Sequence, residues 1–101
     1  MTTERLYYPE VECETTPSDL YETEVVGVLD ETENRHYLRV AQGAVHQVEG
    51  KSYLPIGIVE VDRRGGRVLV QLPYEADSGA SRLWVPLGRF RSEVQSGEFV
   101  A

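Results

Sequence analysis

The chain has 101 residues, a formal net charge of -7 and a single cysteine. This length is typical of one domain, and one cysteine excludes an intramolecular disulfide, so packing has to stabilise the fold. The apolar runs are too short to cross a bilayer, and the first residues lack the pattern of a signal peptide. We therefore expect a cytoplasmic protein that is not inserted in a membrane.

Charge is distributed unevenly along the chain. Residues 1–34 carry ten acidic residues and one basic residue, whereas residues 35–101 carry seven acidic and nine basic residues. We divide the chain into an acidic N-terminal arm (1–19), a β-rich body (20–91) and a C-terminal tail (92–101). Because an acidic protein repels a phosphate backbone, we do not expect the intact chain to bind nucleic acid.

The arm contains the only segment with a helical pattern. Thr16 is a suitable N-cap, Pro17 fits the first helical position, and Asp19 lies where a capping carboxylate would. We predict a single helical turn over residues 16–21. The preceding residues Leu6, Tyr8 and Val11 alternate imperfectly, which favours a loosely docked strand.

From Glu24 onward, short runs of β-branched and aromatic residues are bounded by turn residues, which predicts strands. The runs are 25–29, 35–40, 44–48, 52–54, 58–61, 67–72 and 82–85. Residues 35–40 alternate, with Leu38 and Val40 on the face of His36, as in a half-buried strand. Gly65 and Gly66 would supply the positive φ angles of a tight hairpin turn. These features predict an all-β protein, a small SH3-like barrel with at most one short helical turn.

Two segments of the body share one template of aromatic, aliphatic, proline, aliphatic, glycine, any residue and apolar. They are residues 53–59 and 84–90, and an aspartate-turn-arginine piece precedes each of them, at Asp30 and at Asp62. The body is therefore predicted as a two-fold internal repeat, with coincidence between two strand ends as the alternative. Strands should end at Pro55 and Pro86, because proline removes a ladder N–H. Four residues should be buried: Leu54, Val59, Val85 and Phe90.

This combination resembles the PRC-barrel domains, small β-barrels found in the H subunit of photosynthetic reaction centres and in a ribosome-maturation protein. The resemblance covers about residues 20–91. It is carried by Val28-Leu29-Asp30, Arg35, Tyr37-Leu38-Arg39-Val40, Leu54-Pro55-Ile56 and Val59, and again by Gly57-Ile58-Val59, Asp62, Gly66-Arg67-Val68, Val85-Pro86-Leu87 and Phe90. It implies a non-catalytic docking unit, an inference from fold analogy alone.

Reactive side chains are few. If residues 41–43 form a turn, His36 and His46 fall on one face of adjacent strands and await a carboxylate such as Glu33, but structural zinc requires four ligands. Cys13 lies among acids whose field raises a thiol pKa and lowers its reactivity. Gly65 and the glycine after it precede a strand, unlike a phosphate-binding loop. We expect no catalytic, cofactor or metal site, and no enzyme activity.

Two features could bind a partner: the acidic arm with Tyr7, Tyr8 and Tyr21, as a mobile interaction segment, and a group of basic residues. Arg63, Arg64 and Arg67 crowd one turn, and Arg82 lies near the second prolyl strand end. They would suit a carboxylate-rich protein or an RNA backbone, although arginines at exposed turns are also ordinary surface residues. We expect a protein-binding or assembly module whose partner is another protein or a second copy. The alternatives are an RNA- or ribosome-associated factor and, last, a small hydrolase or redox enzyme.

Overall fold

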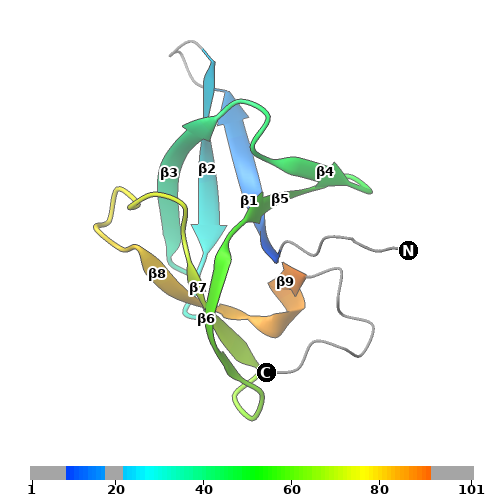
Figure 1. Ribbon diagram of the computed structural model, residues 1–101, viewed down its shortest axis with the longest axis vertical. Helices are drawn as coiled ribbons and strands as arrows, with labels where there is room; N and C mark the ends of the chain where they lie inside the picture. The colour runs from blue at the N-terminus through cyan, green and yellow to red at the C-terminus, as the bar shows by residue number, and fades with distance from the viewer. Residues whose placement is uncertain (1–8, 18–21, 92–101) are drawn as a thin grey trace.

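The structure, a computed structural model, describes residues 9–17 and 22–91, which form two antiparallel sheets (Figure 1). The all-β class is confirmed. The elements are β1 (Glu10–Pro17), β2 (Thr23–Leu29), β3 (Arg35–Ala41), β4 (His46–Val48), β5 (Lys51–Pro55), β6 (Gly57–Asp62), β7 (Arg67–Gln71), β8 (Arg82–Pro86), the 3-10 turn η1 (Leu87–Arg89) and β9 (Phe90–Arg91). Within the described ranges, η1 is the only helical element.

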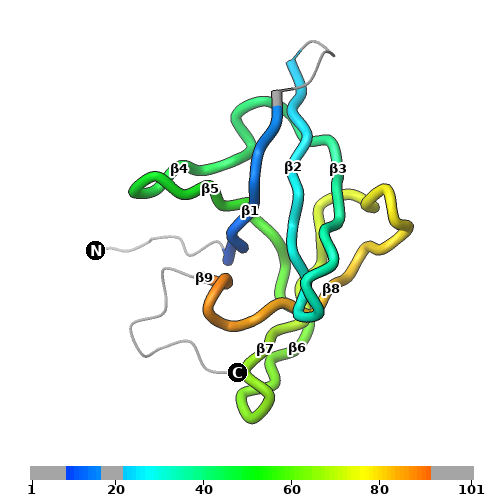
Figure 2. The backbone as a smooth tube through the Cα atoms, turned by 180° about the vertical axis from the view of Figure 1, so that it is seen from behind, coloured from blue at the N-terminus to red at the C-terminus, as the bar shows by residue number. Residues whose placement is uncertain are grey.

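The larger sheet has the strand order β3-β2-β1-β5-β4, with β9 paired to β1, and the smaller sheet has the order β6-β7-β8. Figure 2 shows the β6–β7 hairpin extending away from the β2 and β3 strands. No pairing among the described strands joins the two sheets edge to edge, so these strands do not close into one barrel. In residues 9–17 and 22–91 no helix is long and apolar enough to cross a membrane.

β1 was not expected as a central strand. Its first half pairs with β5 and its second half with β2, where Thr16 lies opposite Val25 and Pro17 opposite Glu24. The predicted helical turn is therefore wrong at these two residues, while residues 18–21 lie outside the described part. The extended backbone is favoured because pairing with β2 satisfies the backbone groups that a single helical turn would leave open.

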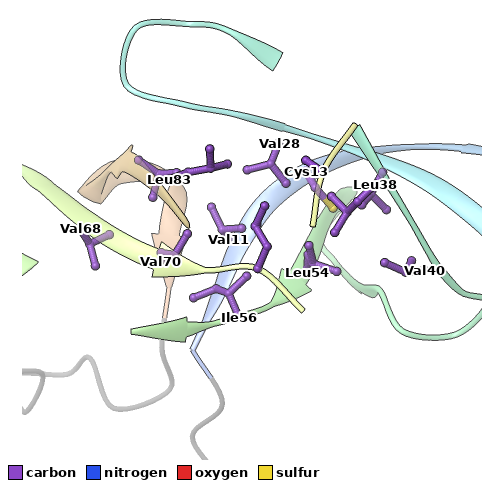
Figure 3. Packing of buried hydrophobic residues seen from close by; sticks show 14 residues of the cluster. Val11, Cys13, Val28, Leu38, Val40, Leu54, Ile56, Val68, Val70 and Leu83 are labelled. Atoms are coloured by element: carbon purple, nitrogen blue, oxygen red, sulfur yellow. The ribbon is translucent and has the colours of Figure 1, made fainter. Parts of the chain in front are cut away.

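A single apolar core lies between the two sheets. Figure 3 shows Val11 of β1, Ile56 after β5 and Val70 of β7 converging in it. Alternation within β1 explains how an acid-rich strand reaches the core, because Val11 and Cys13 are buried between acidic neighbours. The buried apolar residues are Val11, Cys13, Val26, Val28, Leu38, Val40, Leu54, Ile56, Val68, Val70, Leu72, Ala76, Leu83 and Val85.

The predicted repeat is matched in local features. Pro55 ends β5 and Pro86 ends β8, and both Leu54 and Val85 are buried. The chain then differs, because β6 begins two residues after Pro55 whereas η1 follows Pro86 directly. Phe90 is half-buried against the core.

Val59 was predicted to be buried, but 40% of it is exposed. The register of β6 shifts between Ile58 and Glu60, so Val59 occupies a bulge without a partner on β7. A bulge interrupts the alternation of the strand, and the pattern that predicted burial fails at that point.

The turn between β6 and β7 also differs from expectation. It has four residues, Arg63 to Gly66, and only Gly66 has a positive φ, of 68°. Gly65 is needed for a different reason: a Cβ there would lie 2.5 Å from Asp62 Oδ2. Glycine therefore allows the Asp62 carboxylate to pack against the turn.

Candidate functional site

Asp62 organises the turn that carries the predicted partner-binding arginines. Its Oδ1 accepts a hydrogen bond from the Gly65 N–H at 2.9 Å, and its Oδ2 accepts one from Arg67 Nε at 3.0 Å. The Gly65 N–H first, and then the Arg67 guanidinium, lower the pKa of Asp62 below its ordinary value. The Asp62 carboxylate therefore stabilises the turn between β6 and β7.

Arg67 is also bound from the other sheet. Its Nη1 donates to Glu31 Oε2 at 2.8 Å, and its guanidinium carbon lies 4.0 Å from the centroid of the Trp84 ring. The Glu31 N–H in turn donates to the Trp84 carbonyl at 2.8 Å. Two carboxylates thus neutralise the Arg67 guanidinium, and the Trp84 ring covers one of its faces. Few N–H donors of Arg67 remain for a phosphate ligand.

Arg82 is separated from this turn. β7 and β8 pair Arg67 with Pro86 and Gln71 with Arg82, so Arg82 lies four residues along the strand, about 13 Å away. Its Nε donates to Gln71 Oε1 at 2.9 Å. Arg63 and Arg64 are exposed in the turn itself. The structure therefore brings three of the four arginines together and leaves the fourth at the far end of β8.

The outer strand of the smaller sheet is more exposed than the sequence indicated. Ile58 and Val59 on β6 are each 40% exposed, although both are large and apolar. Ile58 lies opposite Val70, on the buried face of the sheet, but β6 pairs only with β7 among the described strands. One edge of β6, with two adjacent apolar side chains, therefore has no strand partner in the described part of the chain. Sequence reasoning missed it because these residues have the pattern of a core strand.

The two histidines lie far apart. His36 is on β3 and His46 is on β4, the opposite ends of the larger sheet, so the hypothesis of a two-histidine site on adjacent strands is wrong. β4 pairs with β5 rather than with β3, because the chain crosses to the other side of β1 after residue 41. Within the described ranges, no group of three or more His, Cys, Asp or Glu side chains is placed to hold a metal ion.

His36 joins two segments that are distant in sequence. Its Nε2 lies 2.8 Å from Asp30 Oδ2, and its Nδ1 lies 2.7 Å from Ser78 Oγ. A neutral imidazole that donates to Asp30 accepts from the Ser78 hydroxyl, which is the order found in Ser-His-Asp nucleophile sites.

The surroundings of Ser78 do not complete a nucleophile site. The Asp77 N–H donates to the Tyr37 carbonyl, the Gly79 N–H donates to the Ala76 carbonyl, and the Ala80 N–H is directed at Ser78 Oγ itself. These amides are engaged within the protein, whereas an oxyanion hole needs donors directed at the substrate. The array instead fastens the loop before β8 onto the β2–β3 turn.

The acids of β1 are paired with cations of the body. Glu10, only 4% exposed, lies 3.0 Å from His46 Nδ1 and accepts from Arg91 Nε at 2.9 Å. The described part of the acidic arm that forms β1 thus belongs to the sheet. Cys13 lies in the same strand, and burial first, followed by the field of the neighbouring acids, raises its pKa to about 12. The expectation of a raised thiol pKa is confirmed, with burial as a cause that the sequence did not reveal.

A comparison with protein-family models, curated proteins and solved structures finds no match to this chain.

Proposed function

We propose that this chain is a non-catalytic assembly module, of the SH3-like kind that the PRC-barrel resemblance implies, which associates with a second copy of itself through the open edge of β6. The supporting observation is the exposure of Ile58 and Val59 on that edge. An edge strand presents unpaired backbone N–H and C=O groups, and adjacent apolar side chains gain burial when another strand pairs with it. An antiparallel pair of identical strands is self-complementary, as a two-fold dimer requires.

Charge supports β6 as the place where two copies meet. Residues 9–17 and 22–56, which include the larger sheet except β9, carry nine acidic and three basic residues, a net charge of -6. Residues 57–71, which form the β6–β7 hairpin, carry two acidic and three basic residues, a net charge of +1. Two copies repel each other through the acidic sheet, whereas the hairpins approach at little electrostatic cost.

Among the described strands, the other main sheet edges accept hydrogen bonds from neighbouring loops or are short. On β3, the Tyr37 carbonyl accepts from the Asp77 N–H at 2.8 Å, and on β8 the Trp84 carbonyl accepts from the Glu31 N–H at 2.8 Å. β4 has three residues, a length that limits pairing. β6 has six residues, and in the described part of the chain its only strand partner is β7.

The alternative of an RNA- or ribosome-associated factor has weaker support. It needs several arginines free to neutralise phosphates, and Arg67 is already bound by Asp62 and Glu31. The larger sheet adds a repulsive field around this site.

Sedimentation of the full chain across a wide concentration range tests the proposal. We expect a dimer that dissociates on dilution, and the Ile58→Lys variant should remain monomeric at every concentration while keeping a folded β structure by circular dichroism. Tyr74→Lys is the matched control, because Tyr74 is exposed in a loop away from β6 and its replacement should leave the dimer intact. A wild-type chain that stays monomeric at millimolar concentration, or an Ile58→Lys variant that dimerises normally, would contradict self-association through β6.

A further inference from the structure

A cavity of about 190 Å³ opens between β1, β2, β3 and η1, apart from the β6 edge. Its wall includes Glu12, Cys13 and Glu14 of β1, Arg35 of β3 and Arg89 of η1. Four of these five side chains carry charge. A cavity lined in this way selects its ligand by charge and hydrogen bonding more than by apolar contact.

Among the described residues, each charged side chain of the cavity wall except Arg89 forms an ion pair. Glu14 Oε1 lies 3.3 Å from Arg35 Nη1, and Glu12 Oε1 lies 3.8 Å from Lys51 Nζ. Arg89 Nη1 is buried and has no hydrogen-bond partner among residues 9–17 and 22–91. A buried guanidinium N–H without an acceptor lowers the stability of the fold, because it has lost its hydrogen bonds to water and forms none within the protein. The cavity wall therefore contains one uncompensated positive group.

Gly27 explains how a second guanidinium reaches this place. A Cβ at Gly27 would lie 3.1 Å from Arg35 Cδ and 3.2 Å from Arg35 Cγ. Because Gly27 has no Cβ, the aliphatic part of the Arg35 side chain packs closely against β2, and its guanidinium lies beside Glu14. Cys13 contributes no charge, because burial raises its pKa to about 12 and the thiol stays protonated at neutral pH.

We propose that this cavity binds a small oxyanion, a carboxylate or phosphate group, with Arg89 as its principal ligand and Arg35 at its side. The planar guanidinium offers parallel N–H donors that match two oxygens of such a group. Arg89 lines the cavity and forms no ion pair with the described residues, so an incoming anion would supply its counter-charge. The cavity holds roughly six water molecules at about 30 Å³ each, so it fits one anionic group with a few attached atoms. A whole nucleotide needs a larger pocket.

A cation is excluded by the same contacts. Both carboxylates in the wall already face a cation, Arg35 or Lys51, and a further positive ion would lie against Arg89. The inference does not depend on self-association, because none of the cavity residues belongs to β6.

Binding is tested with inorganic phosphate and with acetate, each titrated into the full chain at constant ionic strength, with chloride as the reference anion. We expect saturable shifts in the amide and guanidinium NMR signals of the cavity residues and a higher thermal unfolding temperature. Comparison of the phosphate and acetate titrations shows which class of oxyanion is preferred. Arg89→Gln should weaken binding at least tenfold, whereas Arg82→Gln, which removes an exposed arginine on β8, should bind as the wild type does.

The unfolding temperature without added anion provides an independent measurement. Because Arg89→Gln removes a half-buried guanidinium whose Nη1 has no hydrogen-bond partner among the described residues, the variant should be as stable as the wild type or more stable under these conditions. A chain that shows no saturable response to either anion would overturn the proposal. So would an Arg89→Gln variant that binds as tightly as wild type, or one that loses stability without anion, since the latter would make Arg89 structural.

Discussion

The guanidinium of Arg67 lies over the ring of Trp84, with its central carbon 4.0 Å from the ring centroid. The two residues come from neighbouring strands of the smaller sheet, and the same guanidinium binds Glu31, in the turn between two strands of the larger sheet. This contact therefore links the two sheets on the side away from the core. A cation held over an indole face and paired with carboxylates adds stability beyond the area it buries.

Trp84→Ala should lower the free energy of unfolding by about 2 to 3 kcal/mol, less than a fully buried tryptophan would lose, because the ring is half-buried. Trp84→Phe keeps a ring beneath Arg67 and should lose less. Urea denaturation measures both. A loss below about 1 kcal/mol for the alanine variant would mean that the indole is a surface side chain with no role in holding the sheets together.

Gly65→Ala should destabilise the β6–β7 turn, because its Cβ would lie 2.5 Å from Asp62 Oδ2 and would displace the carboxylate from its bonds. We expect a lower denaturant midpoint than for the wild type, because the Asp62 carboxylate loses its hydrogen bonds to the Gly65 N–H and to Arg67. Gly88→Ala is the matched control, because a Cβ at Gly88 meets nothing within 4 Å. Equal effects of the two substitutions would contradict this account of the turn.

Asp30 should make the stability of the fold fall at acid pH. Burial raises its pKa, but hydrogen bonds from His36, from the Asn34 N–H and from Thr32 outweigh that effect and lower the pKa from 3.8 to about 2. Since the folded state holds the proton more weakly than the unfolded state, this stabilisation is complete above the unfolded pKa and is lost as pH falls from about 4 to about 2.

The contribution of Asp30 is on the order of 1 to 2 kcal/mol once solvent screening is considered. Thermal unfolding of the wild type between pH 5 and pH 2 should show the loss. Asp30→Asn should be less stable at neutral pH and should lack this part of the pH dependence, whereas Glu75→Gln, which changes an exposed loop carboxylate, should follow the wild-type curve. An unchanged acid slope in Asp30→Asn would contradict the assignment.

The intact chain should show no measurable RNA binding at physiological salt. Fluorescence anisotropy with labelled single-stranded and duplex RNA, at low and physiological salt, measures this. Weak binding that appears only at low salt is compatible with the arginine turn acting as a general basic surface. Tight, salt-sensitive binding by the full chain would instead favour the RNA-associated alternative.

The effect of the β1 acids on RNA binding cannot be tested by deleting residues 1–15. Glu10, Glu12 and Glu14 lie on β1 and face Arg91, Lys51 and Arg35 respectively. The deletion would remove most of the strand at the centre of the larger sheet and would unfold it. Single changes such as Glu31→Gln, which releases Arg67 from one carboxylate, are the sharper way to ask whether the turn can bind RNA.

Most strands follow from local signals in the sequence. Alternation predicted Leu38 and Val40 on the buried face of β3 and Tyr37 on the exposed face, as the structure confirms. Proline marked the ends of β5 and β8. Such signals depend on neighbouring residues only, and backbone geometry ties them directly to extended structure and turns.

Which strands are neighbours depends on contacts between distant segments, and these contacts also place the candidate site residues. Arg67 was a candidate for partner binding, but Glu31, 36 residues away, binds its guanidinium. His36 was considered beside His46, but it meets Ser78, 42 residues away. Val59 was expected in the core, but β6 became an edge strand with a bulge. In each case the contact that places the residue involves a segment distant in sequence. The same residue pattern is found in edge strands and in central strands, so the pattern alone does not predict strand pairing.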